Sequence, residues 1–392
     1  MNTSNAPANT ASGAIAGNAP GPYTYHPRSG RRRLVGPDVT RALALIGVVI
    51  MNYHGFMDEN FGHAVPGSSF MTRLFDPWTG VLSTRFAATF VFVAGVGVTL
   101  LTNRSRLARD RQAISADRWR LVRRGALLYG FGIFFDWVWA GTILPYYGAM
   151  FIVAALLFTL RSRWIALVGV VATASAVSIQ WWAVPRIYAG NYPYWLFGPN
   201  TFSEHMPRGL LYDVFVNGTH PLLPWLAFLC AGIIIGRALP AVPYVRLALG
   251  GVALTAVCYA INHWVTPQMS SYRLSQAILS TQPFSRGLLY VLCTLGSSVA
   301  AFCIVSLVAE RFASSFVVRV LQLAGQTSLT LYVGHAYFYK IADALGFVQP
   351  TGLGRSLTLA LVYWVLAIVL AALWQFAFGI GPVEWFYRKF GG

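Results

Sequence analysis

Residues Ser356–Val383 read SLTLALVYWVLAIVLAALWQFAFGIGPV, a run of 28 residues without a single Asp, Glu, Lys or Arg. A helix that crosses the hydrocarbon core of a bilayer needs about 20 mostly apolar residues. Nine further runs of this kind precede it, so we expect ten spanning helices. The other predicted ranges are Val39–Gly55, Thr84–Thr102, Trp119–Trp139, Thr142–Leu160, Trp164–Val184, Leu222–Leu239, Val245–Val265, Arg286–Ala309 and Val320–Lys340.

The composition of the whole chain points to the same fold class. Of the 392 residues, 56% are hydrophobic and only 10% are charged. Soluble domains carry about 25% charged residues, so this chain cannot cover a water-exposed surface. The sequence therefore predicts an all-α, polytopic transmembrane helix bundle in contact with the lipid bilayer.

The net charge of +17 is explained by membrane topology. In a soluble protein such a charge would indicate a nucleic-acid partner, whereas cytoplasmic loops of membrane proteins collect Lys and Arg. With the N-terminus inside and ten alternating helices, 21 basic residues lie inside and 8 outside. We therefore expect both termini in the cytoplasm and no nucleic-acid partner.

The first 38 residues differ from the rest of the chain. They are dominated by Ala, Asn, Gly, Ser, Thr and Pro and lack an apolar periodicity. Such a composition cannot bury enough apolar surface to fold. We expect residues 1–38 to be a disordered cytoplasmic tail and residues 39–392 to form a single transmembrane domain.

The histidines cluster on one side of the predicted topology. All except His26 fall near the outer face, which indicates an extracytoplasmic cavity with proton chemistry, although each could be an ordinary interfacial residue. No two have the spacing of three or four residues that pairs metal ligands on a helix face, so we expect no metal. The outer-face histidines are His54, His63, His205, His220, His263 and His335.

Asp136 falls inside the third predicted helix, between Phe135 and Trp137. A carboxylate at this depth is costly and marks a functional or paired position. Two interpretations stay open. Asp136 orients an outer histidine, His63 or His335, or it forms a buried ion pair with Arg85 or Arg286.

Two motifs near the N-terminus carry a resemblance to a known superfamily. The first predicted helix ends in Met51-Asn52-Tyr53, and His63-Ala64 follows, with the His 11 positions after the Asn; the second helix contains Phe92-Val93-Ala94-Gly95-Val96. The chain resembles the transmembrane acyltransferase superfamily. Its best-known family is heparan-α-glucosaminide N-acetyltransferase, and the YeiB-like bacterial membrane proteins are relatives.

Three later segments resemble the YeiB-like proteins more closely, and the matches are spread over most of the membrane part. These are Ile143–Gly148, Asn217–Trp225 and Gly325–Tyr332. One departure is clear, because Tyr146-Tyr147 stand where the acetyltransferase has Gln-Arg. This puts in doubt any substrate contact that the family makes there.

The resemblance implies a single acyltransferase-like domain that moves an acyl group, expected to be acetyl, from cytoplasmic acetyl-CoA to an extracytoplasmic hydroxyl or amine. It implies that Asn52 and His63 are the catalytic pair, with His63 as base and Asn52 as oxyanion donor, and we add Asp136 beside them. An aromatic-rich outer loop favours an envelope sugar or glycolipid as acceptor. The expected location is the bacterial cytoplasmic membrane, and homo-oligomerisation stays open.

Eight arginines lie between Arg104 and Arg124, on the predicted cytoplasmic side. Arginine suits phosphate geometry, so Arg109, Arg111, Arg118 and Arg120 are our candidates for binding the CoA nucleotide. The alternative is that this patch only sets topology. Two further functions stay open for the chain, a transporter or flippase for a lipid-linked or small anionic molecule, and a non-catalytic scaffold.

Overall fold

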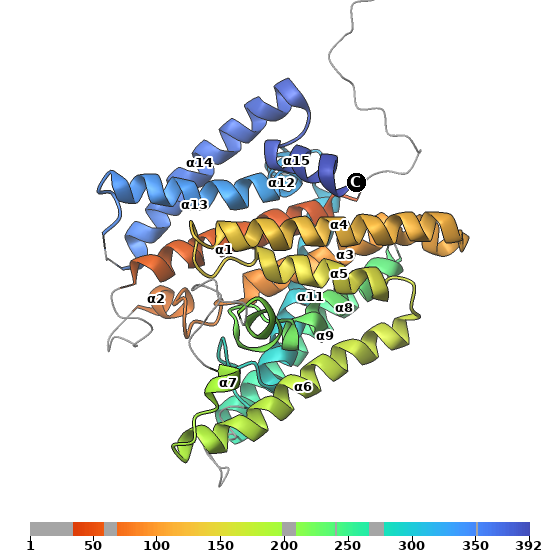
Figure 1. Cartoon of the computed structure of the whole chain (residues 1–392). Coiled ribbons are helices and arrows are strands. Elements are labelled where there is room, and N and C mark those ends of the chain that lie inside the picture. The colour runs from red at the N-terminus through yellow and green to blue at the C-terminus, as the bar shows by residue number, and fades with distance from the viewer. Residues whose placement is uncertain (1–33, 59–68, 198–208, 240, 266–277, 350–351) are drawn as a thin grey trace, which may run out of the picture. The chain divides into compact units, whose positions relative to one another are not determined.

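The computed structural model describes residues 34–58, 69–197, 209–239, 241–265, 278–349 and 352–392, with side chains of the third range from Tyr212 onward. Within these ranges every regular element is helical, which confirms the predicted all-α bundle (Figure 1). The elements are α1 (Gly36–Met57), α2 (Phe70–Leu74), α3 (Arg85–Ala108), α4 (Arg111–Phe135), α5 (Leu144–Leu157), α6 (Ser162–Tyr188), α7 (Tyr194–Phe197), η1 (Gly209–Asn217), α8 (Leu222–Ala238), α9 (Tyr244–Ala260), η2 (Ile261–Val265), α11 (Leu288–Arg311), α12 (Phe316–Gln326), α13 (Ser328–Ala344), α14 (Leu353–Phe378) and α15 (Pro382–Gly391).

Six of the described helices are long and apolar enough to cross a membrane: α1, α3, α6, α9 with its extension η2, α11 and α14. Helices α5 and α8 are apolar but shorter, and the first half of α4 is rich in arginine. The chain is therefore an integral membrane protein. The predicted count of ten crossings is larger than the number that these length and composition criteria identify.

Several predicted boundaries differ from the structure, and two of these differences concern α1 and the pair α12 and α13. The range Val320–Lys340 is broken at Thr327 into α12 and α13, where Glu384 of α15 accepts hydrogen bonds from the backbone N–H groups of Leu329 and Thr330 at 2.7 and 2.9 Å. Helix α1 begins at Gly36 rather than after residue 38, with Pro37 in its first turn. Proline suits that position because no intrahelical bond needs its N–H.

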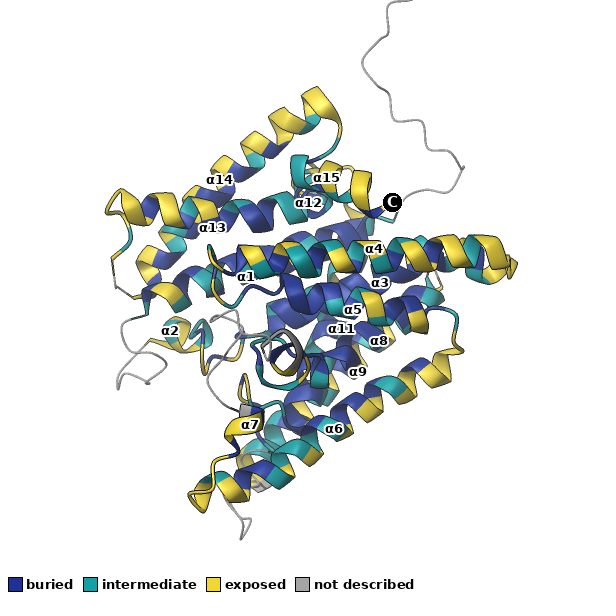
Figure 2. Cartoon of the chain, viewed as in Figure 1, coloured by how far each residue is buried: buried dark blue, intermediate teal, exposed yellow. Residues whose placement is uncertain are grey.

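Helix α1 is the central helix of the bundle. It packs against α3, α11, α12, α13 and α14. Ala42, Leu45, Val49 and Tyr53 follow one another at helical spacing and are at most 1% exposed. Figure 2 shows the contrast with α6 and α14, whose outer faces are exposed along much of their length as expected for contact with lipid. The side chains on this face of α1 thus lie inside the bundle.

Glycines allow neighbouring helices to approach closely. In the contact between α4 and α5, a Cβ on Gly125 would lie 2.6 Å from the carbonyl oxygen of Gly148. In the contact between α3 and α8, a Cβ on Gly232 would collide with the carbonyl oxygen of Phe92. Small residues at such contacts are typical of membrane helices, and they hold the walls of the site described next.

Candidate functional site

A cavity of about 690 Å³ follows one face of α1. Arg41, Leu45, Val48 and Asn52 line it at spacings of four, three and four residues, so they form a single stripe on that helix. Helix α3 forms part of the opposite wall and runs antiparallel, with Gly97 beside Arg41 and Phe86 beside Gly47. From Arg41 to Asn52 the helix rises about 16 Å, so the cavity extends through much of the bundle.

One end of the cavity, the basic end, is lined by Arg41, Arg124 and Arg388. Glu384 is the carboxylate among the lining residues there, and its oxygens are already bound to the start of α13. Arg41 lies 3.6 Å from Asp38 in an ion pair whose arginine side chain is 25% exposed. Three guanidinium groups against two carboxylates, Glu384 and Asp38, leave this end with an excess of positive charge that suits an anionic group.

Helix α15 forms part of the basic end. Tyr387 and Arg388 line the cavity, and the Arg124 guanidinium lies 5.4 Å from the centre of the Tyr387 ring. Arg124 also donates to the carbonyl oxygen of Gly392 at 2.8 Å. The packing of α15 on α4 and α13 thus brings residues from the last turns of the chain to the first helix.

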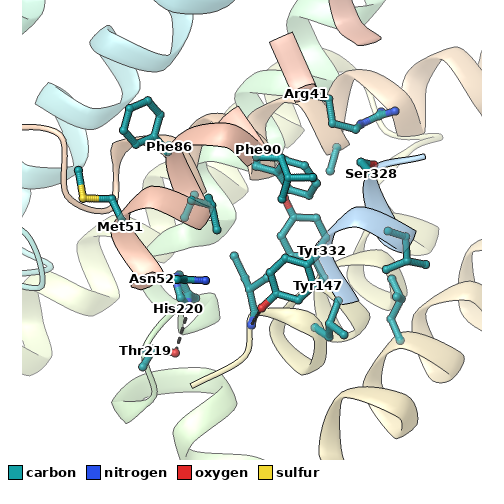
Figure 3. Close-up of a pocket in the computed structure, with 18 of the residues that line it drawn as sticks. Arg41, Met51, Asn52, Phe86, Phe90, Tyr147, Thr219, His220, Ser328 and Tyr332 are labelled. Atoms are coloured by element: carbon teal, nitrogen blue, oxygen red, sulfur yellow. Dashed lines mark hydrogen bonds between the residues drawn. The ribbon is translucent and has the colours of Figure 1, made fainter. Parts of the chain in front are cut away.

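The middle of the cavity is apolar. Its walls include Leu45, Phe86, Phe90, Ala94 and Leu128, which come from α1, α3 and α4. Figure 3 shows Arg41 and Ser328 toward one end, Asn52, Thr219 and His220 toward the other, and Phe90, Tyr147 and Tyr332 between them. An elongated ligand with an anionic head and a thinner, less polar tail fits this distribution.

The other end, the imidazole end, contains Asn52, Thr219 and His220. His220 Nδ1 lies 2.9 Å from the hydroxyl of Thr219, which itself donates to the carbonyl oxygen of Gly141 at 3.4 Å. Nδ1 therefore carries the proton and Nε2 keeps a lone pair. Burial, and secondly the charge of Arg286, lower the pKa of His220 to about 3, so the ring is neutral at pH 7.

Asn52 has a second imidazole behind it. Its Nδ2 lies 3.1 Å from Nε2 of His335, a fully buried residue of α13 that is 0% exposed. The neighbouring Tyr53 donates its hydroxyl to the carbonyl oxygen of His335 at 2.8 Å. The adjacent residues Asn52 and Tyr53 thus attach α1 to a single residue of α13.

Of the three predicted catalytic residues, Asn52 and Asp136 lie among the described residues and His63 does not. Asn52 lines the cavity, whereas His63 lies outside the described residues, so their pairing stays a prediction. Asp136 is buried at the end of α4, where one carboxylate oxygen accepts from the N–H of Gly141 at 2.9 Å. Gly141 lines the cavity, so Asp136 supports its wall.

Three of the partners predicted for Asp136 form hydrogen bonds to other groups, and the fourth, His63, lies outside the described residues. Both ring nitrogens of His335 are engaged, by Asn52 and by the carbonyl oxygen of Tyr332. The Arg286 guanidinium donates to the carbonyl oxygens of Val216, Asn217 and Gly218, and Arg85 donates to the Thr294 hydroxyl and to the carbonyl oxygen of Thr281. The role of Asp136 beside a histidine or an arginine therefore stays a prediction.

The arginines predicted to bind CoA do not line the cavity. Arg109 and Arg111 are exposed around the tight turn between α3 and α4. Arg118 donates to the carbonyl oxygen of Ala155 at 3.1 Å, and Arg120 pairs with Asp117 on its own helix at 2.9 Å. None of the four is among the lining residues. Their role in binding CoA stays a prediction.

Sequence reasoning missed the arginines of the basic end as a group. Arg41 is the one Lys or Arg within the predicted span Val39–Gly55, and an arginine inside a span is a signal of function. Arg388 offers no such signal, because it follows the last apolar run in an amphipathic segment. Among the described residues there is also no group of three or more His, Cys, Asp and Glu side chains arranged to hold a metal ion.

Comparison with known proteins gives one family match. Residues 242–391 match the model of a family described as a protein of unknown function, DUF418. YeiB-like proteins carry this region, so the match agrees with that part of the resemblance. It covers less than half of the chain, including His335 and Arg388 but not Arg41 or Asn52. No curated protein matches the sequence.

Proposed function

We propose that the chain is an integral membrane acyltransferase of the bacterial cytoplasmic membrane. It would move an acyl group, expected to be acetyl, from cytoplasmic acyl-CoA to a hydroxyl or amine of an extracytoplasmic sugar or glycolipid. The observation that carries the proposal is the cavity, because it joins a cluster of arginines to an amide and an imidazole along about 16 Å of α1. The basic end would face the cytoplasm, as the distribution of Lys and Arg predicts.

The donor would enter from the basic end. Coenzyme A carries phosphate groups, which Arg41, Arg124 and Arg388 can bind through charge-assisted hydrogen bonds. Its long, thin arm would occupy the apolar middle beside Phe90 and Leu128. The thioester would then lie near Asn52, on the side from which an extracytoplasmic acceptor can approach.

The reaction at the imidazole end needs a base and an oxyanion donor. A neutral imidazole takes the proton from the acceptor, whose oxygen or nitrogen attacks the thioester carbonyl carbon. An N–H of Asn52 stabilises the negative oxygen that forms. The carbon–sulfur bond then breaks, and the CoA sulfur leaves with the proton from the imidazolium. The resemblance favours His63 as this base. His220 is the second candidate because it lines the cavity with a free Nε2 lone pair, and its lowered pKa makes it the weaker base.

The test is release of free CoA thiol from acetyl-CoA by protein purified into nanodiscs, with glucosamine as the probe acceptor and radiolabelled acetyl to detect product. His63→Ala and His220→Ala separate the two candidate bases, and the true base should lose about 10²–10⁴-fold in rate. His263→Ala is the matched control, because His263 is exposed and outside the cavity lining. Near-normal transfer in the double variant His63→Ala/His220→Ala would contradict the mechanism.

A transporter or flippase is the second candidate, because the same cavity has polar groups at both ends. Such a protein would move a lipid-linked or anionic substrate across vesicles without acyl-CoA. Flux that is independent of acyl-CoA, together with no release of CoA thiol, would favour it over the acyltransferase.

A further inference from the structure

We infer that His335 is a positioning residue that fixes the side-chain amide of Asn52 for the transfer reaction. The inference rests on the proposed function, since it assigns a role relative to the oxyanion donor. Asn52 lines the cavity, whereas His335 is fully buried behind it and is not among the lining residues. His335 therefore acts through Asn52.

The hydrogen bonds of His335 determine where its proton lies. Nδ1 bonds to the carbonyl oxygen of Tyr332, which can only accept, so Nδ1 carries the proton. Nε2 of the neutral ring is then an acceptor, and it faces Nδ2 of Asn52 at 3.1 Å. One N–H of the amide is thereby directed at the ring, and the orientation of the remaining N–H and of the carbonyl oxygen is set.

The surroundings of His335 keep the ring in place. The Trp139 ring meets it edge-on with centroids 4.9 Å apart, and the Tyr332 ring lies at the same distance. Tyr53 stacks at 6.1 Å and binds the His335 carbonyl oxygen through its hydroxyl. These ring contacts, together with the hydrogen bond of Nδ1 to Tyr332, hold Nε2 toward Asn52.

The hydrogen bond to His335 determines which atoms of the Asn52 amide face a ligand in the cavity. The two ends of a carboxamide have the same shape but opposite hydrogen-bonding character, so a cavity-lining amide without an acceptor behind it can rotate by 180°. Rotation would place the carbonyl oxygen where the reaction needs an N–H donor. An acceptor at Nε2 favours one of the two orientations, and preorganised donors of this kind are what stabilise a developing oxyanion.

The kinetic test is a double-mutant cycle with His335→Phe, His335→Gln and Asn52→Ala. Phenylalanine fills the aromatic cage but offers no acceptor, so kcat should fall about 10- to 100-fold with the KM for acetyl-CoA unchanged. Glutamine can accept from Asn52 and donate to Tyr332, so it should recover most of the rate. Asn52→Ala/His335→Phe should be no slower than Asn52→Ala alone.

A purely structural role predicts a different pattern. His335→Phe and His335→Gln would then lose activity in proportion to their thermal stability, and the losses of the double variant would multiply; either result overturns the inference. Tyr363→Phe is the matched control. The Tyr363 hydroxyl also bonds to a backbone carbonyl oxygen of α13, that of Leu331, but it makes no bond to Asn52, so kcat should be preserved.

A measurement that needs no acyl transfer separates this inference from the proposed function. Solid-state NMR of protein labelled with ¹⁵N-histidine, with His335→Gln used for assignment, reports which ring nitrogen carries the proton. Nδ1–H is expected at His335, and an Nε2–H form at neutral pH would overturn the inference. If Nδ1–H is found but the wild type releases no CoA thiol, the proposed function fails while the Asn52–His335 geometry stands.

Discussion

Arg41 offers the sharpest test of how the donor binds. If the basic end holds the CoA phosphates, Arg41→Gln should raise the KM for acetyl-CoA while leaving kcat nearly unchanged. A hydrogen bond to a charged group contributes about 1.5–3 kcal/mol. Arg41 shares its charge with Asp38 at 3.6 Å and is partly exposed, so the lower end applies and the expected increase is about tenfold.

The assay compares two donors that differ in the nucleotide, the part of the donor that carries the phosphates. Release of thiol is followed with acetyl-CoA and with acetyl-pantetheine, which lacks the nucleotide. Arg41→Gln should raise the KM for acetyl-CoA only, and high salt should reduce the difference because exposed charges are screened. Arg109→Gln/Arg111→Gln is the control outside the cavity. Equal effects of Arg41→Gln on both donors would refute the basic end as the nucleotide site. A larger effect of the control pair would indicate that the nucleotide binds to the arginines between Arg104 and Arg124, as the sequence predicts.

Three further predictions rest on the described contacts, and a fourth rests on the distribution of basic residues along the sequence. Gly232→Val should lower the free energy of unfolding in detergent by about 1–3 kcal/mol or more, because its side chain clashes with α3. Gly250→Ala is the control, because no atom lies within 4 Å of the added Cβ. Equal melting temperatures of the two variants would contradict the close helix contact. The free energy of unfolding should fall as the pH decreases from about 6.5 to about 3, because unfolded His220 takes up a proton in this range while the folded ring stays neutral; a His220→Gln protein with the same pH slope would argue against it. Asp136→Ala should destabilise the fold by about 1–3 kcal/mol because the Gly141 N–H loses its acceptor. Asp136→Asn should destabilise it less. Loss of turnover in a fully stable Asp136→Asn protein would instead indicate that Asp136 takes part in the reaction. A reporter fused after Gly392 should be active only in the cytoplasm, and activity outside would reverse the proposed orientation.

The helical architecture could be predicted from local sequence. Runs such as Ser356–Val383 are so apolar and so long that a helix in lipid is the structure that satisfies their backbone groups. Even so, the break at Thr327 was missed, because it depends on Glu384, which lies 54 residues beyond Thr330 and binds the start of α13. The hydropathy of an apolar run indicates that the run is helical. It does not indicate where a helix ends within the run, because that depends on a residue remote in the sequence.

The candidate site, too, could be predicted from the sequence only in part. Sequence alone singled out Asn52, since a short motif carries it, and it placed the histidines together on one side. It could not pair Asn52 with His335, 283 residues away, nor bring Arg41, Arg124 and Arg388 to one end of a cavity. Those contacts depend on which faces of the helices meet and how closely they pack. Helix formation is set by neighbouring residues, whereas the juxtaposition of side chains is set by packing between segments that are remote in the chain.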